Sequence, residues 1–405
     1  MSDKKSLLIL LPLLVVFCFP ESLLAQACPK KKIIEYGWDV PYPDFVRDHI
    51  REMEAKPFEG IIFRTNGFNH VFDTRPWNRS EFQPHLDTLA QIKWQKFTDN
   101  FLTLYAANKW KMDWFNDEHW KVITENMKLF SLAVQTGNCV GVCFDPEPYG
   151  ENPWAYPGSY QDKSFAEVGD QVRRRGQEFM AALQEHKREL KVLSFFLMAL
   201  FPNVVDEPDP QVRMQKLQKN SYALLPAFVV GMLEAAAPGT ILIDGNESAY
   251  YHENPLEFYK DYHLMRQRGQ TLVPEPLRKK YNTNVQAGMA LYIDQALGKR
   301  TTPTTSHYLS PEQQLRFFEH NVYYALTTTD EYVWCYSERM NWWLPAEKAG
   351  PHGPLPPGVE EALVSARRKY DEGKPLGYDI ADLIQAGHQK RRQAESQAGK
   401  SDGES

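Results

Sequence analysis

The chain has 405 residues, of which 42% are hydrophobic and 24% charged, and its formal net charge is -6. This length accommodates one large domain with long loops. The net acidity, without a long basic cluster outside the tail, argues against nucleic acid as a partner.

The first residues have the pattern of a secretory signal peptide. Two lysines precede an apolar run over 7–19, and the small-x-small sequence of residues 25–27 comes just before Cys28. The run is too short for a transmembrane helix, and no other stretch of the sequence is long enough. We therefore expect residues 1–27 to be removed and the mature protein to be secreted or periplasmic. A lipid anchor at Cys28 is an alternative, although Ala25 stands where the attachment pattern has leucine.

Strand-like and helix-like runs alternate along the rest of the chain. Strands are expected over 33–38, 58–64, 101–105, 139–144, 192–200, 240–244, 285–293 and 331–336. Helices are expected over 45–55, 82–97, 120–135, 165–190, 212–236, 255–268 and 311–326. Eight strands alternating with helices predict an α/β fold, the parallel (β/α)8 TIM barrel with long strand-to-helix loops. A doubly wound open sheet is the alternative, but no glycine-rich phosphate loop follows any strand.

One barrel domain is expected over residues 28–384. Residues 385–405 are rich in Gln, Lys, Arg, Ser and Gly, so we interpret them as a frayed helix that runs into a disordered polar tail. The sequence shows no internal repeat of the length that would indicate a solenoid.

The end of the fourth strand is the strongest candidate for chemistry. Alternate side chains of an extended chain share a face, so Cys143, Asp145 and Glu147 point away from Val142 and Phe144. In a parallel barrel the face of the smaller residues enters the interior, and active sites lie at the carboxyl ends of the strands. Two carboxylates about 6.5 Å apart along a strand suit a site where one acid tunes the other. We therefore expect Asp145 and Glu147 to be catalytic; the alternative is helix caps or surface ion pairs.

Other strand ends bring more polar and aromatic residues to the same rim. Glu247 follows the sixth strand, and Glu338 shares its parity with the aromatics of strand eight, so both are candidate catalytic acids. The plainer alternatives are a surface carboxylate for Glu247 and an ion pair with Arg339 for Glu338. Aromatic faces bind the apolar side of a sugar, and polar groups bind its hydroxyls. The candidate substrate-binding residues are Trp38, Asp39, Arg64, Asn108, Tyr149, Asp244, Tyr336 and Trp342.

The segment 144–150, Phe-Asp-Pro-Glu-Pro-Tyr-Gly, resembles the Phe-Asp-x-Glu-Tyr-Pro-Gly end of the fourth strand in family 18 chitinase-like barrels. In that family the Glu is the acid and the Asp positions the acetamido group of the substrate. The resemblance therefore implies that Glu147 is the proton donor and Asp145 its helper. Cys143 stands where the family has a further Asp, and Pro146 replaces its usual aromatic. More broadly, the chain is similar to secreted barrel proteins of the glycoside hydrolase superfamily.

Carboxylates at several strand ends, framed by Trp, Tyr, Asn and Arg, match the needs of glycosidic bond cleavage. One acid protonates the leaving oxygen, and another group stabilises or attacks the oxocarbenium-like carbon. We therefore expect a secreted bacterial glycoside hydrolase that cleaves a poly- or oligosaccharide by carboxylate general acid/base chemistry, with no cofactor and no metal. One alternative is a noncatalytic carbohydrate-binding envelope protein. The other is a metal-dependent sugar isomerase or lyase, with Asp145, Glu147, Glu247 and His252 as ligands.

Overall fold

Nine short strands, all parallel, form the central sheet in the order β7-β6-β5-β4-β3-β2-β1-β9-β8. They are β1 (Lys32–Gly37), β2 (Gly60–Phe63), β3 (Phe101–Tyr105), β4 (Gly141–Asp145), β5 (Lys191–Ser194), β6 (Ile241–Asp244), β7 (Val285–Ala287), β8 (Met289–Tyr292) and β9 (Tyr332–Ser337). This computed structural model describes residues 29–39, 41–344 and 353–401. The expected signal peptide over 1–27 and the candidate anchor Cys28 lie outside these ranges.

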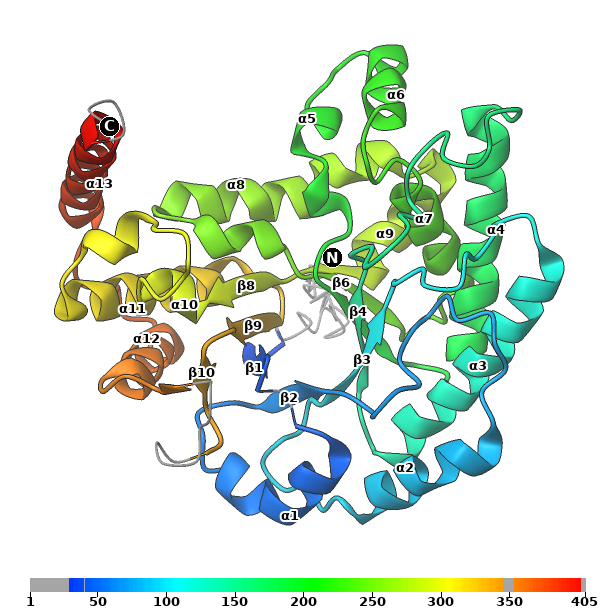
Figure 1. Cartoon of the computed structure of the whole chain (residues 1–405), viewed down its shortest axis with the longest axis horizontal. Coiled ribbons are helices and arrows are strands. Elements are labelled where there is room, and N and C mark those ends of the chain that lie inside the picture. The colour runs from blue at the N-terminus through cyan, green and yellow to red at the C-terminus, as the bar shows by residue number, and fades with distance from the viewer. Residues whose placement is uncertain (1–28, 40, 345–352, 402–405) are drawn as a thin grey trace, which may run out of the picture. The chain divides into compact units, whose positions relative to one another are not determined.

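β7 and β8 are two halves of one barrel strand, interrupted at Gly288. β7 pairs with β6 and β8 pairs with β9, so this strand joins the two ends of the sheet. Gly288 donates its N–H to the carbonyl of Asp244 at 2.7 Å. A Cβ at this position would lie 2.9 Å from Cγ2 of Ile243, so a side chain would have to displace its neighbours. The predicted (β/α)8 barrel is confirmed, and Figure 1 shows its ring of strands.

Helices connect the strands and lie around the outside of the barrel (Figure 1). They are α1 (Pro43–Met53), α2 (Arg79–Gln91), α3 (Asp117–Thr136), α4 (Phe165–Leu183), α5 (Pro202–Val205), α6 (Pro210–Gln218), α7 (Leu225–Ala235), α8 (Pro255–Arg266), α9 (Arg278–Asn284), α10 (Ile293–Ala296), α11 (Pro311–Thr328), α12 (Val359–Asp371) and α13 (Ala381–Ser401). Short 3-10 turns are η1 (Met198–Leu200), η2 (Glu247–Tyr251), η3 (Arg268–Leu272), η4 (Glu275–Leu277) and η5 (Thr305–Tyr308), and a small pair of strands is β10 (Met340–Asn341) with β11 (Gly353–Pro354). Within the described ranges, no helix is both long and apolar enough to cross a membrane.

Some predicted helices differ from the observed ones. The single helix expected over 212–236 is two helices, because Pro226 lacks an N–H and starts α7 as a new helix after a loop. The segment expected as a frayed helix that runs into a disordered polar tail is helical as far as Ser401, where α13 ends, and an ion pair between Arg391 and Glu395 links successive turns.

The amino-terminal end of the barrel contains a buried ion-pair network. The Nζ of Lys32 lies 2.9 Å from carboxylate oxygens of both Asp99 and Glu331, and the Nζ of Lys191 lies 2.8 Å from Glu331. The hydroxyl of Tyr332 donates to Asp99. Burial alone would raise the pKa values of both acids, but these hydrogen bonds outweigh it and hold both pKa values below their usual range. The network therefore fills this end of the barrel in its charged form.

Glu331→Gln should lower the free energy of unfolding at pH 7 by about 3 kcal/mol, because Lys32 and Lys191 then lose a shared buried counter-charge. The folded-state pKa of Glu331 is depressed, so its contribution is present above the unfolded-state value of 4.5 and is lost as the pH falls through the folded-state value. Denaturant titrations at several pH values measure this. The control Glu125→Gln removes an exposed pair on α3 and should cost less than about 0.5 kcal/mol. Equal effects of the two substitutions would contradict the assignment.

Candidate active site

Two glutamates lie at equivalent positions beyond β4 and β6. Phe144 of β4, Ser194 of β5 and Asp244 of β6 stand at one level of the sheet register. Glu147 and Glu247 each follow this level by three residues, at the carboxyl ends of their strands. One strand separates them, so the two backbones are about 10 Å apart at a strand spacing of about 4.8 Å. Burial, and next the charge of Glu147, raise the pKa of Glu247 to about 7.

Asp145 is fully buried next to Glu147, and Tyr149 contacts both acids. Oδ1 of Asp145 accepts the N–H of Glu147 at 2.8 Å, and its Oδ2 lies 3.0 Å from the Tyr149 hydroxyl. The same hydroxyl contacts Oε2 of Glu147. Burial, and next the charge of Glu147, raise the pKa of Asp145 well above its usual value. A hydroxyl has one proton to donate, so a protonated Asp145 can donate to Tyr149 while Tyr149 donates to Glu147.

A cluster of aromatic rings fills the carboxyl end of the barrel beside these acids. Trp334 stacks on Phe195, with ring centroids 4.6 Å apart and planes at 9°. Four tyrosines, which we call the tyrosine cluster, pack together with centroid distances between 4.9 and 5.6 Å; they are Tyr36, Tyr250, Tyr292 and Tyr336. Since Tyr36 and Tyr250 also contact the indole of Trp334, the tyrosine cluster rests on the stacked pair.

Glu338 follows β9, on the side of the barrel formed by β8, β9 and β1. Its Oε2 accepts the hydroxyl of Tyr292, and its N–H donates to Asp294 at 2.7 Å. Glu247 acts on another member of the tyrosine cluster: after burial, its charge is the next cause that raises the pKa of Tyr250. The tyrosine cluster therefore contacts Glu338 at one edge and neighbours Glu247 at another.

Three of the predicted substrate-binding residues, Trp38, Arg64 and Tyr149, line one cavity of about 410 Å³. The side chain of Trp38 is 63% exposed and that of Tyr149 is 50% exposed, so both offer ring faces to a ligand. A fourth predicted residue, Tyr336, belongs to the tyrosine cluster. The structure thus brings these four side chains to the same rim as the acids.

Asp244 and Asn108, also predicted to bind substrate, hold backbone groups instead. The carboxylate of Asp244 is fully buried and accepts the N–H groups of Leu197 at 2.9 Å and Ala199 at 2.7 Å. Burial raises its pKa to about 6 in spite of these bonds. Oδ1 of Asn108 accepts the N–H of Met112 at 2.7 Å. Both side chains fix loops at the rim.

Asp39 and Trp342, the other two predicted binding residues, contact each other. Oδ2 of Asp39 accepts the N–H of Trp342 at 3.0 Å. The indole of Trp342 is 2% exposed and meets the ring of Phe58 edge-on at 4.7 Å. A sugar cannot stack on a ring that is packed in the core, so Trp342 has a structural role.

Tyr222 is a residue of the site that the sequence did not indicate. It lies on the loop between α6 and α7, where the sequence predicted a continuous helix. Burial, and then the charges of Glu147, Asp145 and Glu247, raise its pKa to about 12. Its hydroxyl therefore lies within electrostatic reach of all three acids.

Asp145, Glu147, Glu247 and His252 are the candidate metal ligands of the isomerase or lyase alternative. His252 bonds through Nε2 to Asp261 at 2.8 Å. Among the residues that the structure describes, no group of three or more His, Cys, Asp or Glu side chains could hold a metal ion.

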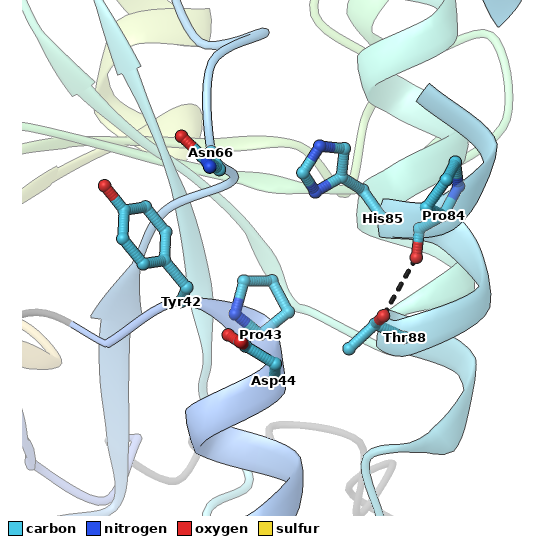
Figure 2. A pocket seen from close by; sticks show the side chains of 7 residues that line it. All are labelled: Tyr42, Pro43, Asp44, Asn66, Pro84, His85 and Thr88. Carbon is cyan, nitrogen blue, oxygen red and sulfur yellow. Dashed lines mark hydrogen bonds between the residues drawn. The ribbon is translucent and has the colours of Figure 1, made fainter. Parts of the chain in front are cut away.

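A smaller hollow of about 220 Å³ lies beside the start of α1 and the middle of α2 (Figure 2). Figure 2 shows Tyr42 and Asn66 on one side of it and His85 of α2 on the other. The guanidinium of Arg64 lies 5.1 Å from the centroid of the Tyr42 ring. Tyr42 thus lines the hollow and contacts a residue of the larger cavity.

Comparisons with known proteins give only distant similarities. No family model matches the chain, and no curated protein matches it. Among solved structures it is similar to a glucosidase from Croceicoccus marinus, with 10% identity over 85% of this chain and 68% of that one and a TM-score of 0.44. A GH5_18 from Bifidobacterium longum subsp. infantis has 9% identity over 84% and 79%, with a TM-score of 0.46. A protein described as a sugar phosphate isomerase/epimerase from Anabaena variabilis has 10% identity over 86% and 99%, with a TM-score of 0.43. At this level of similarity, function has to be argued from the side chains.

Proposed function

We propose that this protein is a glycoside hydrolase in which Glu247 protonates the leaving oxygen and Glu147 is the second carboxylate. The observation that carries the proposal is the coupled pair beyond β4 and β6, in which the charge of Glu147 helps to raise the pKa of Glu247 to about 7. A general acid must hold its proton at the working pH, while its partner must be ionised. The sequence resemblance implied the proton-donor role for Glu147; the raised pKa of Glu247 favours the exchanged roles.

The other residues of the rim support this division of labour. The hydroxyl of Tyr149 contacts both Asp145 and Glu147, so it holds the Glu147 carboxylate in one position. As positive charge develops on the anomeric carbon, the carboxylate of Glu147 stabilises it, by attack on the carbon or by activating a water. The proton of Glu247 passes to the glycosidic oxygen and the bond to the leaving sugar breaks. Trp38 and Tyr149 offer exposed ring faces for the sugars.

The test is a screen of the protein without residues 1–27 against an array of neutral and charged poly- and oligosaccharides, with product analysis by mass spectrometry. Cleavage should be fastest below about pH 7 and decline above it, since Glu247 then loses the proton that it donates. Binding of a glycan without cleavage at any pH would favour the noncatalytic carbohydrate-binding alternative. In keeping with the signal-peptide pattern, we propose that the protein acts outside the cytoplasm.

Tyr149→Phe should lower kcat by about tenfold to a hundredfold with little change in KM, because it removes the hydroxyl that orients Glu147 but neither acid. Steady-state kinetics on the glycan found in the screen measures this. Tyr259→Phe is the matched control, since this exposed tyrosine of α8 lies outside the site. An unchanged kcat in Tyr149→Phe would remove Tyr149 from the mechanism.

A further inference from the structure

The cavity of about 410 Å³ beside Tyr149 carries basic groups and contacts the proposed catalytic centre. Arg64, His70 and Lys109 line it, and no carboxylate is among its described lining residues. The hollow of Figure 2 differs, because the carboxylate of Asp44 lines it. The cavity therefore presents basic groups close to Glu147, since Tyr149 lines the cavity and its hydroxyl contacts Glu147.

Arg64 is held in place at the end of β2. Its guanidinium lies 5.1 Å from the ring centroid of Tyr42, in a cation–π contact. Burial is the largest effect on the pKa of Tyr105 and raises it. The positive charge of Arg64 lowers this pKa, so Arg64 lies close to the Tyr105 hydroxyl. In the part of the chain that the structure describes, Nε of Arg64 is buried without a hydrogen-bond partner. An anion bound at the guanidinium would offset the cost of this desolvation.

His70 is fixed by backbone pairing to the end of β3. It forms an isolated parallel bridge with Tyr105. On either side of it, the N–H of Val71 donates to the carbonyl of Tyr105 at 2.9 Å, and the N–H of Tyr105 donates to the carbonyl of Asn69 at 2.8 Å. Its ring meets the indole of Trp110 at 5.2 Å. Nδ1 of His70 is also buried and lacks a partner among the described residues. This wall of the cavity is thus formed in advance of ligand binding.

The remaining walls of the cavity are aromatic. Tyr36, Trp38, Tyr105 and Tyr149 line it together with the basic groups. A pyranose ring fits such walls through its apolar face, while a charged substituent on the ring reaches the basic groups. A neutral sugar would leave the guanidinium of Arg64 without a charged partner in the cavity.

We propose that this cavity is a subsite for an acidic sugar, in which the carboxylate of a uronic acid residue binds to Arg64 and Lys109. The inference rests on the proposed hydrolase and names its substrate class. The planar guanidinium forms paired hydrogen bonds with a carboxylate.

Binding to the mature Glu247→Gln protein tests this without cleavage of the ligand. Isothermal titration compares a uronic acid oligosaccharide, a sulfated one and a neutral one of the same length. The uronic acid ligand should bind at least about tenfold more tightly than the neutral one, a difference of about 1.4 kcal/mol. A second substitution, Arg64→Gln, should abolish this preference and leave affinity for the neutral ligand nearly unchanged. Lys121→Gln is the control, since this exposed lysine of α3 lies outside the cavity and should preserve the preference.

Thermal melting shows whether the Arg64→Gln protein is folded; if it is not, Lys109→Ala at the exposed Lys109 replaces it. Equal affinity for acidic and neutral ligands, or an equal loss of both in the variant, would overturn the proposal. Tighter binding of the sulfated ligand would replace the uronic acid by a sulfate ester. Cleavage of neutral glycans without an acidic preference would refute the subsite and leave the hydrolase intact. Tight uronic acid binding without cleavage by the wild type would refute the hydrolase and leave the subsite intact.

Discussion

Glu147→Gln should lower turnover by about a hundredfold to ten-thousandfold while the protein still folds and binds its glycan. Glu147 is the carboxylate that stabilises the developing positive charge, and an amide of the same shape cannot do so. The loss should be equally large for substrates with good and poor leaving groups, since no leaving group replaces a missing anion. Kinetics on the cleaved glycan and on an aryl glycoside of the same sugar measure both. Glu151→Gln, at an exposed glutamate of the same loop, is the control and should keep full activity.

The same substitution has an electrostatic effect that needs no substrate. The charge of Glu147 is one of the two causes that raise the pKa of Glu247, so its removal should lower that pKa from about 7 toward the ordinary 4.5. Titration of the glutamate side-chain carboxyls by NMR detects the change. An unchanged titration of Glu247 in the Glu147→Gln protein would show that the two acids are not coupled.

The barrel could be predicted because its signal is local and repeated. Eight strand patterns alternate with seven helix patterns, and small residues mark the inner face of β4, which leads to Asp145 and Glu147. The place of Glu247 at the rim follows from its strand end in the same way. These features depend only on chain order and on the two-residue period of a strand.

The roles of individual side chains could not be predicted because they depend on contacts between distant segments. Asp244 has the same strand-end position as Asp145, but a turn after β5 uses its carboxylate as a backbone acceptor. The aromatic Trp342 is covered by Phe58, nearly the whole length of the barrel away in sequence. Tyr222 reaches the acids from a loop whose existence depends on a helix break.

The assignment of the proton shows the same limit. Sequence similarity at β4 pointed to Glu147 as proton donor, since only β4 matched the family pattern. A pKa is set by burial and by neighbouring charges. The charge that acts on Glu247 is that of Glu147, which follows β4, two strands away from β6. The strand ends therefore indicate which acids share the rim, but they do not tell which of them is protonated.

Glu247→Gln should lower turnover of a natural glycan by about a hundredfold to ten-thousandfold, but cost far less with an aryl glycoside that has a good leaving group. An activated leaving group departs without a proton, so only the loss of a general acid gives this difference between substrates. Glu147→Gln, in contrast, should impair both substrates alike. Glu338→Gln tests the competing carboxylate that follows β9 and should have the smaller effect, because Glu338 accepts the hydroxyl of Tyr292 in the tyrosine cluster.

Stability gives an independent measure of the same group. The pKa of Glu247 is about 7 in the folded protein and 4.5 as its ordinary value, so the folded state holds the proton more tightly than the unfolded state. Below pH 4.5 the group is neutral in both states and has no effect. As the pH rises from 4.5 to 7, the folded protein must carry a poorly solvated charge next to Glu147, and its stability falls. Denaturant unfolding across this range should show the decline in the wild type and a smaller one in Glu247→Gln. If both proteins lose stability equally, Glu247 does not keep its proton at neutral pH, and it is not the acid.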